Sequence, residues 1–436
     1  MINYKKKIKK NHDVVKDRYS FIRWNAFFLG LLAYTFVNFH RVSLAVLAPS
    51  LLETFKISSA NLGFMSSIYF YCYSPMQPIC GVLTDRWKPR KMLTVFIFIM
   101  SLGILLFSYS QNFTHTYIAR FLIGIGSAGI FVPVSWIISK YFTYNKRGFL
   151  FSLFMLFGNA GSILATLPFA RLINLFGWRN TLAKISFLSF LLLVLIWIFV
   201  RDNNSNHVEK KQINDKNIIE EDKIKISWFF ILKKVLSIPI IKYCFIGSLS
   251  YGAMISLQGL WAVPFFIDIY KMDNATASNF LIMIPIGIAS GTLLLSKLND
   301  SKFGKYIYLW GSISSIVVYL IFTIFTDKIP PILIFILFFV LGFQYGSVPF
   351  LLKMYTLILP KGFYGTALGI VNVFPFFIAA LYLSLTGLIF DWFGVSGIVL
   401  NRSLESYKIY FLFLTLSLII SSIARLKIIK ILDKEY

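Results

Sequence analysis

The sequence contains twelve apolar stretches, each long enough to cross the hydrocarbon core of a membrane as a helix. They fall near 24–50, 60–82, 92–110, 114–138, 149–170, 182–200, 238–266, 277–296, 305–325, 331–352, 364–390 and 407–425. Hydrophobic residues make up 57% of the chain and charged residues only 14%, which excludes an ordinary soluble domain. Backbone groups in hydrocarbon must be bonded within their own segment, so each stretch is predicted to be a helix. The expected fold is an all-α membrane protein with twelve transmembrane helices.

Lysine and arginine are distributed unevenly among the connections between these stretches. With a cytoplasmic N-terminus, thirty-three of the forty-three Lys and Arg fall on the cytoplasmic side and eight on the other side. This bias predicts a multi-pass protein of the cell inner (cytoplasmic) membrane with both termini in the cytoplasm. The net charge of +25 therefore reflects membrane topology. It does not indicate a nucleic acid partner.

The two halves of the sequence repeat each other. One long hydrophilic connection, from Arg201 to Ser237, separates two sets of six stretches. Matching residues in the two sets are separated by a nearly constant offset, 215 for Pro49 and Pro264 and for Asp85 and Asp300, 216 for Pro133 and Pro349, and 213 for Asn159 and Asn372. Parallel repeats of six helices are typical of alternating-access transporters, with the substrate site between the halves. The predicted organisation is a basic tail (1–23), a six-helix bundle (24–200), a linker (201–237), a second, pseudo-symmetric bundle (238–426) and a C-terminal tail (427–436).

Two motifs indicate the family. The connection after the second stretch reads Gly81-Val-Leu83-Thr-Asp85-Arg86-Trp-Lys88-Pro89-Arg90-Lys91-Met-Leu93, and the fourth stretch contains Arg120-Phe-Leu-Ile-Gly124. Both resemble signatures of the major facilitator superfamily, although Lys88 and Pro89 replace its usual Gly and Arg. The resemblance implies the major facilitator fold. It also implies conformational, or gating, roles for the residues of these motifs and for their second-half counterpart, namely Gly81, Leu83, Asp85, Arg86, Arg90, Arg120, Gly124 and Asp300.

Further segments resemble one branch of that superfamily. Phe176-Gly-Trp-Arg179 and the run from Gly365 to Asn372 are similar to the branch of organophosphate/phosphate antiporters and anion/cation symporters. In that branch the first span has an arginine eight residues before a proline, matched here by Arg41 and Pro49. Sugar-phosphate antiporters have a second such arginine in span seven, where this chain has Ser256, and a span-five histidine, where it has Gly158. The resemblance therefore favours a monovalent anion or zwitterion over a phosphate ester.

Arg41 lies deep in the first apolar stretch, far from any carboxylate in sequence. The nearest, Glu53, is roughly 18 Å away along the same helix. Arginine keeps its proton in proteins, and a charge in hydrocarbon is costly unless it faces a partner or a wet cavity. Tyr34, Asn38 and Arg41 share one helical face. We expect Arg41 to bind the anionic group of a substrate; the alternative is a structural arginine bonded to backbone carbonyls.

Other polar residues in the apolar stretches are candidates to line the same cavity. They are Tyr69, Tyr73, Gln77, Ser256, Gln258, Trp261, Gln344, Tyr345 and Asn372. Hydrogen bonding between helices is the competing explanation for each of them. His40 adjoins Arg41 and is considered as a proton carrier, but the residues suggest exchange or uniport because no carboxylate is embedded in a span.

The sequence shows no metal-ligand cluster, nucleotide loop or catalytic constellation, so no metal, no cofactor and no enzymatic activity is expected. The predicted function is secondary active or facilitative transport of a small organic anion or zwitterion by alternating access. The expected partners are that substrate and the lipid bilayer, with the protein monomeric. Two alternatives remain open, a membrane sensor that binds such a ligand without transporting it, and an efflux carrier for a larger metabolite such as a siderophore.

Overall fold

The computed structural model of the chain describes residues 2–201, 228–299, 303–360, 364–394 and 402–435, and its regular structure over these ranges is entirely helical. The first half forms α1 (Ile2–Phe55), α2 (Ser59–Ser108), α3 (Phe113–Ala128), α4 (Phe131–Tyr141), α5 (Tyr144–Leu164), α6 (Leu167–Phe176) and α7 (Trp178–Phe199). The second half forms α9 (Trp228–Leu236), α10 (Pro239–Gly247), α11 (Leu249–Ser256), η1 (Leu257–Trp261), α12 (Ala262–Tyr270), α13 (Asn274–Leu281), α14 (Met283–Asn299), α15 (Gly304–Ile324), α16 (Pro331–Phe343), η2 (Gln344–Ser347), α17 (Val348–Ile358), α18 (Tyr364–Phe393) and α19 (Leu404–Glu435).

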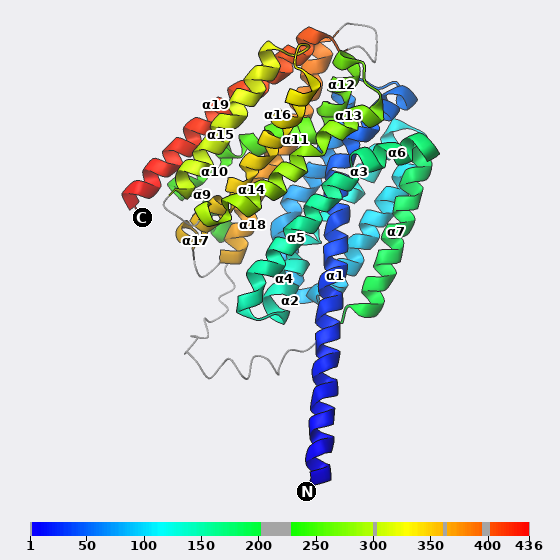
Figure 1. Ribbon diagram of the computed structural model, residues 1–436, viewed down its shortest axis with the longest axis vertical. Helices are drawn as coiled ribbons and strands as arrows, with labels where there is room; N and C mark the ends of the chain where they lie inside the picture. Colours follow the sequence, from blue (N-terminus) through cyan, green and yellow to red (C-terminus); the bar gives the residue numbers. More distant parts are fainter. Residues whose placement is uncertain (1, 202–227, 300–302, 361–363, 395–401, 436) are drawn as a thin grey trace.

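Ten helical segments among the described residues are long and apolar enough to cross a membrane. Two predicted spans are not among the ten. The span near 60–82 forms the first part of α2, which contains several Ser, Tyr and Gln, and the span near 331–352 is divided into α16, η2 and α17. With these two the structure has the twelve-helix arrangement expected from the sequence. The N-terminal tail (1–23) does not form a separate element, because α1 begins at Ile2 and projects beyond the other helices (Figure 1).

The long helix α2 contains a break that separates the second and third spans. Lys88 has φ 61° and ψ 161°, a backbone conformation that L-residues adopt at a cost. Pro89 follows, and it disfavours the helical conformation at the residue before it. The position where the family has glycine therefore has the backbone conformation of a glycine, although the residue is Lys.

The two halves of the chain lie side by side, and they meet along α2 and α18 (Figure 1). We call the end of the bundle where α1 ends and α2 begins the Ser59 end, and the opposite end the Lys88 end. Gly63 of α2 and Gly387 of α18 permit the closest approach: a Cβ at Gly63 would lie 2.4 Å from the carbonyl oxygen of Leu383. Small residues at such crossings let helix backbones touch, which is a common way to join helices in membranes.

Two spans depart from regular α-helix near their middles. The seventh span contains the π-helical segment η1, and the tenth contains the 3₁₀ segment η2. A Cβ at Gly259, within η1, would lie 3.4 Å from the carbonyl oxygen of Arg41, so η1 packs against α1 at the level of that arginine. Such irregular segments are frequent at functional sites.

Candidate functional site

Arg41 is the centre of the candidate site. Its side chain, on the apolar span of α1, is only 9% exposed. Nη1 donates a hydrogen bond to Oδ1 of Asn38 at 3.2 Å, and Nδ2 of Asn38 donates to the carbonyl oxygen of Tyr34 at 3.1 Å. Nε and Nη2 of Arg41 are buried and lack a hydrogen-bond partner within the described part of the chain. The predicted face of Tyr34, Asn38 and Arg41 thus exists, and it leaves two donor atoms for a ligand.

Aromatic rings from both halves surround this guanidinium. Its Cζ atom lies 5.3 Å from the ring centre of Tyr73 on α2 and 5.0 Å from that of Phe376 on α18. Tyr251 of α11 also interacts with it electrostatically. Rings at this distance stabilise a cation but do not neutralise it. Neither ion pair found between described side chains, Lys305–Asp433 or Arg402–Asp268, involves Arg41. The site therefore retains a net positive charge at the interface of the two halves.

The candidates on α2 extend from this site toward the Lys88 end. Tyr69 stacks on Tyr73 with ring centres 5.8 Å apart, and its hydroxyl donates to the carbonyl oxygen of Val37 at 3.4 Å. Two turns farther along, Oε1 of Gln77 accepts a hydrogen bond from Nδ2 of Asn372 on α18 at 3.3 Å. The structure therefore brings Tyr69 and Tyr73 to Arg41, whereas Gln77 and Asn372 bond each other across the two halves.

Two of the span-seven candidates point away from Arg41. Ser256 is fully buried, with its hydroxyl 3.2 Å from that of Thr386 and 3.3 Å from that of Tyr410. Trp261 donates from Nε1 to the same Thr386 hydroxyl at 2.8 Å. Gln258 is buried within η1. Ser256 and Trp261 thus hold spans seven, eleven and twelve together.

The span-ten candidates lie at the irregular segment η2. Gln344 is buried there. The hydroxyl of Tyr345 donates to the carbonyl oxygen of Ser250 at 2.5 Å, and its ring lies 6.4 Å from that of Tyr251. Tyr345 therefore contacts Tyr251, which interacts with Arg41, and does not itself lie against the guanidinium.

Arg120 on α3 is a second buried arginine, 1% exposed. Its Nη1 donates to the carbonyl oxygen of His40 at 3.1 Å, and its Cζ atom lies 4.9 Å from the ring centre of Tyr69. A Cβ at Gly124 would lie 2.6 Å from the carbonyl oxygen of Tyr69, so this glycine lets α3 approach α2. The His40 side chain is buried, and its Nε2 has no partner among the described residues. Nε and Nη2 of Arg120 are buried without a described partner, as in Arg41, but its described contacts all lie within the first half, which fits a structural role. The described contacts of His40 do not form a proton relay.

The remaining residues expected to act in gating that the structure describes lie at the Lys88 end. Gly81 and Leu83 are on α2, Arg86 is exposed, and Arg90 donates to the carbonyl oxygen of Trp197 at 2.7 Å, within the same half. The side chain of Asp85 is not among those that the structure describes, and Asp300 lies outside the described residues.

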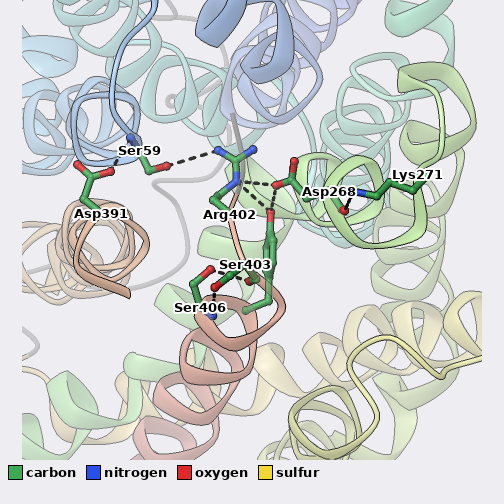
Figure 2. Close-up of polar contacts among 8 residues, drawn as sticks. Ser59, Asp268, Lys271, Asp391, Arg402, Ser403 and Ser406 are labelled. Atoms are coloured by element: carbon green, nitrogen blue, oxygen red, sulfur yellow. Dashed lines mark hydrogen bonds and ion pairs between the residues drawn. The ribbon is translucent and has the colours of Figure 1, made fainter. Parts of the chain in front are cut away.

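The Ser59 end is closed by polar contacts between the halves (Figure 2). The carboxylate of Asp391, at the end of α18, accepts hydrogen bonds from the backbone N–H groups of Ser59 at 2.8 Å and Ala60 at 3.0 Å. Deeper along the same crossing, the hydroxyls of Ser67 and Ser384 are 2.7 Å apart. A carboxylate at the beginning of a helix both caps free N–H groups and interacts favourably with the helix dipole.

Arg402, just before α19, contributes a second contact at this end (Figure 2). Its Nε donates to Oδ2 of Asp268 at 2.7 Å, and its Nη1 donates to the hydroxyl of Ser59 at 3.4 Å. The hydroxyl of Tyr407 donates to the same carboxylate oxygen at 2.7 Å. Burial would lower the pKa of Arg402, but its interactions with the Tyr407 hydroxyl and the Asp268 carboxylate outweigh burial and raise this pKa above its ordinary value. Arg402 therefore stays charged.

Sequence reasoning did not single out Phe376, Tyr251, Asp391 or Arg402. Phe376 is one of forty-six Phe, and Tyr251 lies on the seventh span without a distinctive motif. Asp391 and Arg402 appeared only as charges near span ends. The one available signal was the position of Asp391 at the end of an apolar stretch, on the same predicted side as the beginning of α2.

Two bundles of apolar helices that enclose a buried cation are the architecture of a multi-pass membrane transporter. The sequence model of the Major Facilitator Superfamily matches residues 26–383. The chain belongs to this superfamily, as its motifs indicated.

Individual relatives agree with this membership. The chain is 29% identical over 270 residues to the uncharacterized transporter YybO of Bacillus subtilis, covering 59% of this chain and 61% of that protein. It is 22% identical over 225 residues to the probable sulfoacetate transporter SauU of Cupriavidus necator, covering 50% and 52%. The matches thus span less than two thirds of either relative. A bacterial homolog of the human lysosomal transporter Spinster, solved in an inward-facing, unoccupied conformation, has the same fold, with a TM-score of 0.70, 15% identity, and coverage of 94% of this chain and 98% of that chain.

Proposed function

We propose that this transporter carries small organic anions or zwitterions by alternating access, and that Arg41 binds the anionic group of the substrate. The observation that carries the proposal is that Arg41 has two buried donors, Nε and Nη2, without a partner among the described residues, and that it lies between aromatic rings of both halves. Arg120 has the same two unpartnered atoms, but its described contacts lie within the first half. A buried charged donor without an acceptor is unfavourable, and an anionic ligand relieves that cost. The name of the sulfoacetate relative supports the same substrate class.

The surroundings of Arg41 favour a small substrate with few polar groups. The rings of Tyr73 and Phe376 form walls, and the Tyr251 hydroxyl interacts with the guanidinium itself. Oε1 of Gln77 is bonded to Asn372, which leaves Nε2 of Gln77 as a further donor without a described partner. A single guanidinium matches one carboxylate or sulfonate group through two parallel hydrogen bonds. Span seven supplies no second cation at position 256, because the residue there is a serine, whose hydroxyl lies beside those of Thr386 and Tyr410.

The orientation and the coupling are part of the proposal. The excess of Lys and Arg supports an orientation with the Lys88 end and both termini in the cytoplasm, in the inner membrane of the cell. In that orientation the structure is closed on the outer side by Asp391 and Arg402. We propose exchange or uniport, since His40 lacks a described partner that would exchange a proton with it. An impermeant thiol reagent should label a cysteine introduced at Asn112, and not one at Asn206, in intact cells.

The test of the substrate site is a thermal-shift screen of the purified protein against carboxylates, sulfonates, phosphate esters and neutral sugars. A ligand that binds only the folded state raises the melting temperature. We expect small carboxylates or sulfonates to stabilise wild type and to have no effect on Arg41→Ala. The matched variant is Arg120→Ala, which removes a buried arginine of the same half and should lower stability without changing which ligands bind. If Arg41→Ala responds to the same ligands as wild type, Arg41 is not the anion site.

A further inference from the structure

An apolar groove of about 340 Å³ lies on the outer surface of the first half, away from Arg41. Its walls are Thr94, Val95 and Phe98 of α2 and Leu193, Val194 and Trp197 of α7. Helix α7 lies at the edge of the bundle, so the groove faces the hydrocarbon of the membrane (Figure 1). Phe98, Val194 and Trp197 are 48%, 50% and 55% exposed. The groove is at the small end of the size range of ligand pockets, and it offers an apolar chain a dry, shaped surface.

A cation lies at the end of this groove nearest the Lys88 end. The guanidinium of Arg90 stacks on the Trp197 ring, with Cζ 4.3 Å from the ring centre, and Nη2 donates to the Trp197 carbonyl oxygen. Thr94 donates from Oγ1 to the carbonyl oxygen of Arg90 at 2.8 Å. The backbone of Arg90 therefore lies one helical turn from Thr94, a residue of the groove wall. Lys91 is next in sequence, with Nζ 4.6 Å from the Trp87 ring centre. Trp side chains beside Arg and Lys are typical of the level at which lipid headgroups lie.

We propose that this groove binds one acyl chain of an anionic phospholipid, whose phosphate contacts Arg90. The guanidinium is held at the end of the groove by the Trp197 ring and carbonyl, so its positive charge is in a fixed place to attract a lipid phosphate. The apolar walls exclude a free phosphate compound as the occupant, because such a compound has nothing to place in the groove. The segment 86–91 carries four cations, Arg86, Lys88, Arg90 and Lys91, which complement the negative charge of anionic lipid headgroups.

The chain offers a matched control at the opposite end of α7. Arg179 stacks on Trp178 with Cζ 4.2 Å from the ring centre, and its Nη2 donates to the Ser110 carbonyl oxygen at 3.0 Å. This arrangement copies the arginine, the indole and the carbonyl of the proposed site, but neither residue belongs to the groove walls. Arg179→Gln therefore reports the effect of losing a stacked surface arginine alone.

The experiment is native mass spectrometry of the purified full-length chain, titrated with phosphatidylglycerol and with phosphatidylcholine of identical acyl chains. We expect one tightest site in wild type that binds phosphatidylglycerol about fivefold more tightly, the effect of one basic residue near a lipid surface. Arg90→Gln should abolish that preference, Val194→Trp should fill the groove and abolish the site for both lipids, and Arg179→Gln should behave as wild type. Equal binding of the two lipids by wild type, an unchanged preference in Arg90→Gln, or a retained site in Val194→Trp would each overturn the proposal.

Discussion

Asp391 at the end of α18 caps the beginning of α2, accepting the backbone N–H of Ser59 at 2.8 Å although the two residues are 332 positions apart in the chain. The cap joins the two halves of the transporter at the Ser59 end. In the alternating-access cycle that we propose, this end opens when the other closes, so the cap would break in each transport cycle. Asp391 and Ser59 therefore contribute to the relative stability of the two conformations.

The first prediction concerns this cap. Asp391→Ala should destabilise the form that is closed at the Ser59 end by about 1 kcal/mol, the usual value of a helix cap. The readout is disulfide formation between cysteines introduced at Ser67 and Ser384, whose hydroxyls are 2.7 Å apart in the closed form. The background should have Cys72, Cys80 and Cys244 replaced. Asp391→Asn, which keeps an oxygen acceptor and loses the charge, should have an intermediate effect. An unchanged cross-linking rate in Asp391→Ala would show that the cap does not help to close the Ser59 end.

The second prediction concerns the glycine crossing below the cap. A Cβ at Gly63 would lie 2.4 Å from the carbonyl oxygen of Leu383, and one at Gly387 would lie 2.7 Å from that of Ser59. Backbone atoms cannot move away cheaply, so Gly63→Val should prevent closure of the Ser59 end while the separate bundles still fold. Cross-linking between positions 67 and 384 and substrate counterflow should both be lost. Gly148→Val is the control, because a Cβ at Gly148, on α5, meets nothing within 4 Å; equal loss in both variants would point to general misfolding.

Local patterns predicted the helices, while contacts between distant segments could not be predicted. Hydropathy is a property of each stretch by itself, so the span ranges followed from the sequence, and the helical period correctly put Tyr34, Asn38 and Arg41 on one face. Phe376 reaches Arg41 only because α18 packs on α2, and nothing in its neighbourhood distinguishes it from other Phe residues. Ser256, at the position of the second arginine of sugar-phosphate antiporters, was a candidate to line the cavity around Arg41. Its face of α11 packs instead against α18 and α19, where it meets Thr386 and Tyr410.

The third prediction is a stabilising substitution at Lys88. This residue has φ 61° and ψ 161°, a region nearly exclusive to glycine that costs other residues about 1–3 kcal/mol. A glycine at this position would remove that cost, but part of the stabilisation would be lost because glycine makes the unfolded chain more flexible. Lys88→Gly should therefore raise the free energy of unfolding by about 1 kcal/mol, measured by thermal or denaturant unfolding in detergent. Lys88→Ala is the control for losing the side chain, since it keeps the Cβ and the strained backbone. Identical melting temperatures for the Gly and Ala variants would show that the backbone conformation carries no strain.

The fourth prediction separates charge from geometry at Arg41. Arg41→Lys keeps a cation at the interface of the halves but loses the planar fork whose Nε and Nη2 are available to a ligand. Substrate affinity should fall substantially in Arg41→Lys and further in Arg41→Ala, where losing a charge-assisted contact in a buried site should cost about 2–4 kcal/mol, or about 30- to 1000-fold. Both variants should unfold at nearly the wild-type temperature. Removing an unneutralised buried cation relieves a desolvation cost, which offsets the lost contacts with Tyr73 and Phe376.

A structural arginine would give the opposite pattern. Arg120 is the internal reference, because its Nη1 is bonded to the carbonyl oxygen of His40 and its guanidinium packs on Tyr69. Arg120→Lys should lower the melting temperature, and the surviving protein should bind ligand with nearly normal affinity. Binding affinities and melting temperatures distinguish the two roles. They should be measured side by side, under the same conditions, for Arg41→Lys, Arg41→Ala and Arg120→Lys. If the Arg41 variants melt early and the surviving protein binds normally, Arg41 holds α1 in place and the anion is bound elsewhere.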